Sequence, residues 1–192
     1  EQPNHRRYPI AVLGEGYRGV LTSESTRIPG LVSIVDVAPT ALGEEGALGS
    51  SADDDPLGTL KDLDERIEAN RDAKTVVLLL SLALIVAVAT FFPAGVLPAF
   101  AGVLLANLAL GAVALTEVWI DALVLVCAVA AALLLARAGP VVHGFLMAGV
   151  LAAYLVAMAV DERWVALSPL GPTQNSRFYG LSNLLATLLL LV

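Results

Sequence analysis

The sequence predicts a mainly α protein, in which a polytopic transmembrane helix bundle follows a small α/β segment. The first reason is the distribution of charge, because residues 1–74 hold 8 of the 11 basic and 14 of the 18 acidic residues. The second is the length of the later apolar runs, which reach the ~20 residues that cross ~30 Å of hydrocarbon. The third is their short connections, which require consecutive helices to be antiparallel neighbours. A mean hydropathy of +0.79 agrees with a membrane protein and exceeds that of an ordinary soluble domain.

The composition and the two ends of the chain indicate which class of protein it belongs to. A net charge of −7 without any basic cluster excludes a nucleic-acid partner, since phosphate binding requires clustered Lys and Arg. The chain starts at Glu1 and not at Met, and the apolar pattern of Leu184–Val192 is too short to span a bilayer. We therefore expect an internal piece of a larger membrane protein, with a missing domain upstream.

Residues 1–42 are expected to form the α/β structure. Two runs rich in β-forming residues, Tyr8–Leu13 and Leu31–Val37, are separated by Gly-, Ser- and Thr-rich sequence and are predicted to pair as strands. Asp36 falls at the end of the second run. Its carboxylate is expected to cap a following helix whose first turn contains Pro39.

Two further stretches connect this part to the first apolar run. Residues 43–58 combine Gly and Ser with five acidic residues, which is typical of a solvated linker. Over residues 59–74 the pattern becomes helical, because Leu60, Leu63 and Ile67 share one face. No Gly or Pro follows, so we expect this juxtamembrane amphipathic helix to continue into the bilayer.

The polar part also carries a resemblance to a known family. The stretch Leu21–Val32 (LTSESTRIPGLV), followed by Asp36–Leu42 (DVAPTAL), resembles the C-terminal part of an alkaline-phosphatase-superfamily domain. Phosphopentomutases, cofactor-independent phosphoglycerate mutases and sulfatases of that superfamily have a closing metal-site loop, a short strand and then a similar Asp-x-Ala-Pro-Thr phrase. Where their loop supplies a histidine to a two-metal site, this chain has Ser23, Ser25 and Thr26.

The resemblance implies the fold more directly than the reaction. Hydroxyls are poor substitutes for imidazole on a transition metal. The family's nucleophile and most of its metal ligands would lie upstream of Glu1. A divalent metal is therefore implied for the intact protein, whereas no metal site and no catalytic centre are expected in this chain alone.

Apolar runs bounded by Pro, Gly or charged residues predict four complete spans and one incomplete span. These are expected near residues 75–92, 96–115, 119–136 and 141–160, with the incomplete fifth at 181–192. Small residues recur every four positions in the third and fourth spans, which favours close approach of helix backbones. These are Ala128, Ala132 and Ala136, then Gly144 and Ala148, and Gly149, Ala153 and Ala157.

The short connections also assign polar residues to the two membrane faces. One membrane face is expected to hold the polar N-terminal segment, Glu117, Asp121, Asp161–Arg163 and Arg177. The other is expected to hold Arg137 and His143. A count of Lys and Arg places the first face in the cytoplasm. The resemblance favours the opposite, because many membrane-attached members of the superfamily act on extracytoplasmic substrates. We expect a multi-pass protein of the cell membrane with its polar N-terminal segment outside.

The candidate binding residues lie in the long connection Asp161–Gly180 and at the start of the last run. Asn175, Arg177, Tyr179 and Asn183 are expected to bind a substrate or lipid headgroup, because a guanidinium offers a planar pair of donors to an oxyanion. Polar groups that enter a bilayer are also costly unless they have a partner. The alternative is structural, with the arginine paired to an acidic residue on the same face and the last asparagine bonded between helices.

Two functions follow for the intact protein. The resemblance implies hydrolysis of a phosphate or sulfate ester, or headgroup transfer, on an envelope or lipid-linked substrate. The missing histidine favours the alternative, a transporter or a non-enzymatic membrane assembly subunit. Arg177–Asn183 (RFYGLSN) also resembles a phrase of uncharacterised actinobacterial-type membrane proteins, which brings no known reaction. The expected partners are the lipid bilayer, the upstream domain and other membrane-protein subunits.

Overall fold

A computed structural model describes residues 8–43, 47–114 and 117–171. The chain is mainly helical, with one two-stranded antiparallel sheet, as the sequence predicts. It divides into two compact units, with the boundary between Asp64 and Glu65. We refer to the residues up to 64 as the α/β segment and to the residues from 65 onward as the bundle, and each is considered by itself.

The sheet of the α/β segment pairs β1 (Val20–Ser23) with β2 (Leu48–Ser51), and Val20 lies opposite Ser51. The two predicted strands were wrong. The described residues of Tyr8–Leu13 have no regular structure, and most of Leu31–Val37 belongs to helix α1 (Ile34–Ala41).

The β-branched residues Ile34, Val35 and Val37 therefore lie in helix α1, because the chain makes a turn at Gly30 just before them. Gly30 has a left-handed φ of +87°, and Ser33 has the extended conformation typical of an N-cap. Asp36 lies within the first turn of α1 and not at a strand end. Pro39 lies in the second turn of α1 and not in its first.

The small apolar core of the α/β segment packs against the turn at Gly30. Val20, Ile28 and Leu48 are its buried apolar side chains within the described residues. A Cβ at Gly30 would come within 2.9 Å of the Leu60 side chain and 3.1 Å of the Leu63 side chain. The predicted amphipathic face therefore packs against the segment's own turn.

Residues 47–58, the described part of the acidic stretch after Gly43, contain regular secondary structure. They include strand β2 and the start of helix α2 (Pro56–Phe91). Asp55 accepts the N–H of Gly58 at 3.0 Å, and Asp53 accepts the hydroxyl of Thr59 at 2.8 Å. Two of the acidic side chains thus satisfy polar groups in the first turn of α2, as N-terminal caps do.

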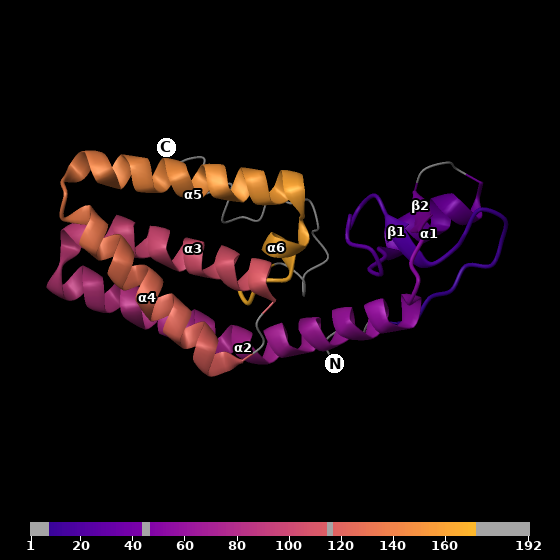
Figure 1. Ribbon diagram of the computed structural model, residues 1–192, viewed down its shortest axis with the longest axis horizontal. Helices are drawn as coiled ribbons and strands as arrows, with labels where there is room; N and C mark the ends of the chain where they lie inside the picture. Colours follow the sequence, from indigo (N-terminus) through magenta and orange to yellow (C-terminus); the bar gives the residue numbers. More distant parts are fainter. Residues whose placement is uncertain (1–7, 44–46, 115–116, 172–192) are drawn as a thin grey trace. The chain divides into compact units, whose positions relative to one another are not determined.

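Within the described residues, four helices are long and apolar enough to cross a membrane, which is consistent with a multi-pass membrane protein. They are α2 (Pro56–Phe91), α3 (Val96–Val113, preceded by the 3-10 turn η1 at Pro93–Gly95), α4 (Val118–Ala136) and α5 (Pro140–Val160); a short helix, α6 (Arg163–Ala166), follows. Successive helices α3, α4 and α5 alternate in direction (Figure 1). The last predicted span, 181–192, lies outside the described residues.

Helix α3 is the centre of the bundle. Ala101 and Leu104 pack with the buried side chains of α5, whereas Ala99, Val103 and Ala106 pack with α4 and the apolar part of α2. A helix that is apolar on all sides is expected to be buried in this way. The other three helices turn much of their apolar surface outward.

Close helix approach occurs at Ala128, a small residue of the predicted pattern, opposite Gly102, which the pattern did not include. A Cβ at Gly102 would come within 2.8 Å of the carbonyl oxygen of Ala128, so α3 and α4 touch there. Ala132 is buried, in agreement with the pattern. Among the described residues, none lies within 4 Å of a Cβ added at Gly144 or Gly149.

The polar residues at the helix ends fall into two groups, one at each end of the bundle. The end of α3, the start of α4, the end of α5 and helix α6 lie together (Figure 1). Asp121 and Asp161 therefore lie at one end, whereas Arg137 and His143 follow the turn at the other. The Nε2 atom of His143 lies 3.2 Å from the carbonyl oxygen of Ala136, which places this histidine at the end of α4.

Candidate functional site: a cavity beside an inserted segment

The four predicted headgroup-binding residues, Asn175, Arg177, Tyr179 and Asn183, lie outside the described residues. Their role stays a prediction. The structure does describe the first half of the same connection, Asp161–Gly171, and this half has a definite place in the bundle.

This part of the connection folds into the end of the bundle. Residues Val165 to Ser168 are buried, although they belong to α6 and a turn. A Cβ at Gly111 would collide with the carbonyl oxygen of Trp164, so this segment lies directly on the last turn of α3. We call Arg163–Gly171 the inserted segment.

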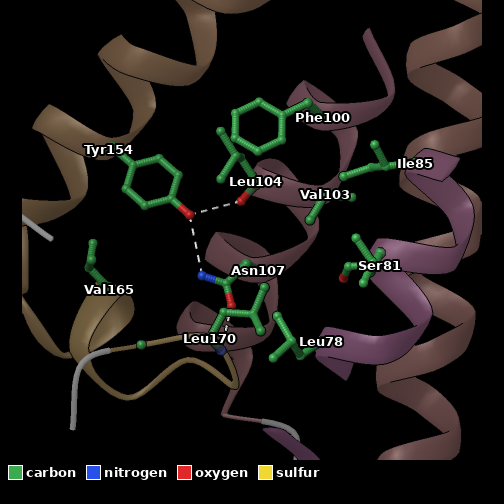
Figure 2. A pocket seen from close by; sticks show the side chains of 12 residues that line it. Leu78, Ser81, Ile85, Phe100, Val103, Leu104, Asn107, Tyr154, Val165 and Leu170 are labelled. Carbon is green, nitrogen blue, oxygen red and sulfur yellow. Dashed lines mark hydrogen bonds between the residues drawn. The ribbon is translucent and has the colours of Figure 1, made fainter. Parts of the chain in front are cut away.

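The inserted segment is held by one asparagine from the middle of a predicted span. The side-chain amide of Asn107 donates to the Ser168 hydroxyl at 2.9 Å and to the Tyr154 hydroxyl at 3.3 Å, and its carbonyl oxygen accepts the N–H of Leu170 at 3.0 Å. Tyr154 in turn donates to the carbonyl oxygen of Leu104 at 3.1 Å. We call these contacts the Asn107 network; Figure 2 shows those that join Asn107 to Tyr154 and Leu170 and Tyr154 to Leu104.

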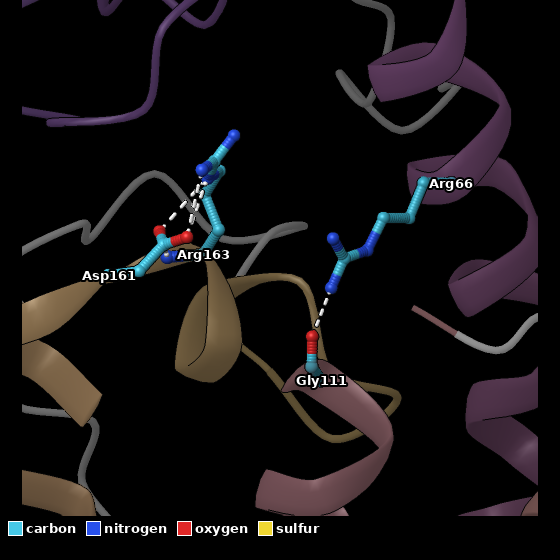
Figure 3. A network of polar contacts seen from close by, with 4 residues as sticks. All are labelled: Arg66, Gly111, Asp161 and Arg163. Atoms are coloured by element: carbon cyan, nitrogen blue, oxygen red, sulfur yellow. Dashed lines mark hydrogen bonds and ion pairs between the residues drawn. The ribbon is translucent and has the colours of Figure 1, made fainter. Parts of the chain in front are cut away.

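Two side chains of α2 hold neighbouring backbone groups. Asn70 donates to the carbonyl oxygen of Leu167 at 2.6 Å. Arg66 donates to the carbonyl oxygen of Gly111 near the C-terminus of α3, where a cation is favoured by the helix dipole (Figure 3). Polar residues of α2 therefore fix both the inserted segment and the end of α3.

An ion pair marks the surface side of the inserted segment. Arg163 and Asp161 approach to 2.8 Å (Figure 3). Partial burial acts to raise the pKa of the Asp161 carboxyl, but hydrogen bonds from Arg163 and the charges of Arg163 and Arg66 outweigh it, so the pKa is lowered. The Arg163 side chain is half exposed and that of Asp161 is partly buried, and ion pairs near the surface contribute little stability.

A cavity of about 190 Å³ lies beside the Asn107 network, between α2, α3, α5 and the inserted segment (Figure 2). Most of its lining is apolar, with aliphatic side chains from α2, α3 and the inserted segment and the aromatic rings of Phe100 and Tyr154. The lining comprises Leu78, Ser81, Leu82, Ile85, Phe100, Val103, Leu104, Asn107, Tyr154, Val165, Leu170 and Gly171.

The polar side chains of this lining already have partners. Both amide hydrogens of Asn107 are used within the network, and Tyr154 donates to a backbone carbonyl. Ser81 donates to the carbonyl oxygen of Val77 at 2.7 Å. The cavity therefore offers apolar surface without a free hydrogen-bond donor among these side chains.

A second polar feature of the bundle is Asp121, in the first turn of α4. Its side chain is fully buried, and neither carboxylate oxygen has a hydrogen-bond partner within the part of the chain that the structure describes. An ionisable residue within a span is a candidate functional group. It does not line the cavity.

In the α/β segment, the hydroxyls of Ser23, Ser25 and Thr26 form hydrogen bonds within their own segment. Ser23 and Ser25 donate to the carboxylate of Asp36, the latter at 2.7 Å, and Thr26 donates to the carbonyl oxygen of Leu31. Burial acts to raise the pKa of Asp36, but the two serine hydroxyls and the N–H of Ser25 outweigh it and lower the pKa. This arrangement connects β1 to α1 and is structural.

Comparison with known proteins adds no relative. No family model, curated protein or solved structure matches the chain. The cavity and the Asn107 network were also not predicted from the sequence. The available signal was a single amide in the middle of an otherwise apolar run, because such a group requires a partner in the bilayer.

Proposed function

We propose that this chain is the membrane-embedded part of a multi-pass envelope protein that acts on an envelope or lipid-linked substrate. For the intact protein, the resemblance around Asp36–Leu42 favours hydrolysis of a phosphate or sulfate ester, or headgroup transfer. The catalytic centre, with its divalent metal, would belong to the upstream domain. The observation that supports the proposal best is the bundle, whose outer surface and whose internal cavity are both suited to hydrocarbon.

The outer surface supports placement in a membrane. Large apolar side chains are exposed along α2, α4 and α5, which would be unfavourable in water. They include Leu78, Leu79, Leu82, Val86, Trp119, Leu123, Leu134, Leu135, Phe145, Leu155 and Val156. In a bilayer these side chains contact lipid.

The topology can be tested with single cysteines. In a Cys127→Ser background, a cysteine at Arg18 and a cysteine at Arg137 should lie on opposite sides of the membrane. We expect a membrane-impermeant maleimide to label the first and not the second in intact cells. The reverse result would place the α/β segment in the cytoplasm.

The ester-cleaving function requires the full-length protein that contains this chain. Purified in lipid nanodiscs, it should release phosphate or sulfate from a lipid-linked ester, and EDTA should stop the release. Arg177→Ala should lower this activity more than tenfold, because the predicted headgroup contact is lost. The matched control is Arg163→Ala, whose guanidinium pairs with Asp161 and should leave the rate unchanged.

The competing function is a transporter or a non-enzymatic assembly subunit. It is favoured by one observation, the engagement of Ser23 and Ser25 with Asp36 at the place where the family has a metal ligand. Full-length protein that folds but releases no phosphate or sulfate, with Arg177→Ala indistinguishable from wild type, would select this alternative. Loss of folding in Arg177→Ala would instead support a structural role for that arginine.

A further inference from the structure

The cavity beside the Asn107 network lies at a depth where the solvent is hydrocarbon. Its lining on α2 runs from Leu78 to Ile85, within the apolar part of that helix. Its lining on α3 runs from Phe100 to Asn107, in the middle of that span. Water is scarce at this depth, so the contents of the cavity are determined by its access to lipid.

The cavity is continuous with the outer surface of α2. Leu78 and Leu82 line it, yet their side chains are 52% and 57% exposed. Ser81, between them in the sequence, is buried. A lipid chain that lies along α2 therefore meets the entrance of the cavity directly.

The chemistry of the lining selects the kind of ligand. The side-chain donors of Ser81, Asn107 and Tyr154 are all used within the protein. A polar headgroup would find apolar walls and no free donor there, and its desolvation would be uncompensated. A hydrocarbon chain requires no such partner.

The size of the cavity is also suitable for a segment of chain. Apolar cavities of about 150 Å³ stay dry and bind benzene-sized ligands. A cavity of about 190 Å³ therefore has room for a short stretch of hydrocarbon and is too small for a whole lipid.

We infer that this cavity binds part of the hydrocarbon chain of a membrane lipid, which enters between the side chains of Leu78 and Leu82. The inference rests on the membrane placement within the proposed function and is independent of ester cleavage. The bound hydrocarbon would contact Val165 and Leu170 of the inserted segment. These two residues belong to the connection Asp161–Gly180, which also contains three of the four predicted headgroup-binding residues.

Photo-crosslinking tests the inference in the complete chain reconstituted into lipid vesicles. The probe is a phosphatidylcholine with a diazirine in the middle of one acyl chain, and a polyprenol with the same group forms a second arm. We expect cross-links to Phe100 and Val103, which line the cavity, with the acyl probe, the polyprenol probe or both. The probe that cross-links to these residues shows whether the cavity binds an acyl chain or a polyprenyl chain.

Two matched variants on α2 separate the cavity from the outer surface. Ser81→Trp fills the cavity and should lower labelling of the lining at least fivefold. Leu79→Trp adds the same group to a side chain that is 59% exposed and does not line the cavity, and it should leave labelling unchanged. If Ser81→Trp does not fold, Val103→Phe fills the cavity from α3 and serves in its place.

Two results would overturn the inference. One is labelling confined to outward-facing residues such as Leu123 and Phe145, which is expected if water or another part of the chain occupies the cavity. The other is labelling of the lining that persists in the folded cavity-filling variant. Neither result depends on whether the full-length protein cleaves an ester.

Discussion

The α/β segment and the bundle each contain a buried polar side chain that several hydrogen bonds hold in place, and these two side chains differ in charge. Asp36 is a carboxylate held by serine hydroxyls, in a segment whose buried residues include polar as well as apolar side chains. Asn107 is a neutral amide held by a hydroxyl pair and a backbone N–H, in a bundle whose buried residues are mostly apolar.

The difference reflects the surroundings of the two parts. A carboxylate on the water-facing side can stay ionised, because solvent and hydroxyl donors together compensate its charge. Within a bilayer, an isolated charge is costly, whereas a neutral amide with all its donors used is not. The bundle can therefore contain a polar network at its centre without a counter-ion.

The largest effect is expected where packing alone determines the bundle. Gly102→Leu places a side chain against the backbone of α4, at Ala128 and Val129, and should destabilise the bundle by about 3 kcal/mol, since overpacking of this kind forces helices apart. Thermal unfolding in detergent measures the change. Gly149→Ala is the control and should be neutral, because no described residue lies within 4 Å of the added Cβ. Equal effects of the two substitutions would show that α3 and α4 are not in close contact.

A smaller effect is expected at the centre of the polar network. Asn107→Leu leaves the N–H of Leu170 without its acceptor and should cost about 2 kcal/mol, the sum of a few interhelical hydrogen bonds in a membrane. Protease cleavage within the inserted segment should increase with it. Leu97→Ala, on the exposed side of α3, is the comparison and should leave cleavage unchanged.

The α/β segment should respond to pH through Asp36. Because its pKa is lowered below the ordinary 3.8 on folding, its contribution to stability is present above that value and is lost as the pH falls through the lowered pKa. The NMR shift of the Ser25 amide, 3.3 Å from the carboxylate, should follow this titration. Asp36→Asn should abolish the pH dependence of this NMR shift and lower the free energy of unfolding by about 1–2 kcal/mol. A titration at or above 3.8 would contradict the arrangement.

The smallest effect is expected at the start of α2. Asp55→Ala removes the acceptor for the N–H of Gly58 and should cost about 1 kcal/mol, as loss of an N-terminal cap usually does. Faster amide exchange at Gly58 and Thr59 would report it. Asp54→Ala is the matched substitution in the same acidic run and should leave exchange at these two amides as in wild type.

The secondary structure was predictable where one physical requirement dominates. Apolar runs of bilayer length, ended by Pro, Gly or charge, required helices, and α3, α4 and α5 lie where these runs do. The short strands were not predictable. Leu31–Val37 has the composition of a strand, but most of it forms α1, because the turn at Gly30 and the contacts of Asp36 override local propensity.

The sequence by itself predicted the apolar helices between residues 75 and 160, because an apolar run of bilayer length can satisfy all its backbone hydrogen bonds internally as a helix. Only the tertiary structure decided that α3 is central, that Asn107 binds the inserted segment and that a cavity lies beside them. The reason is that hydrophobicity places a side chain away from water without specifying its neighbour. The choice of neighbour depends on shape and hydrogen-bond partners, which residues distant in the sequence supply.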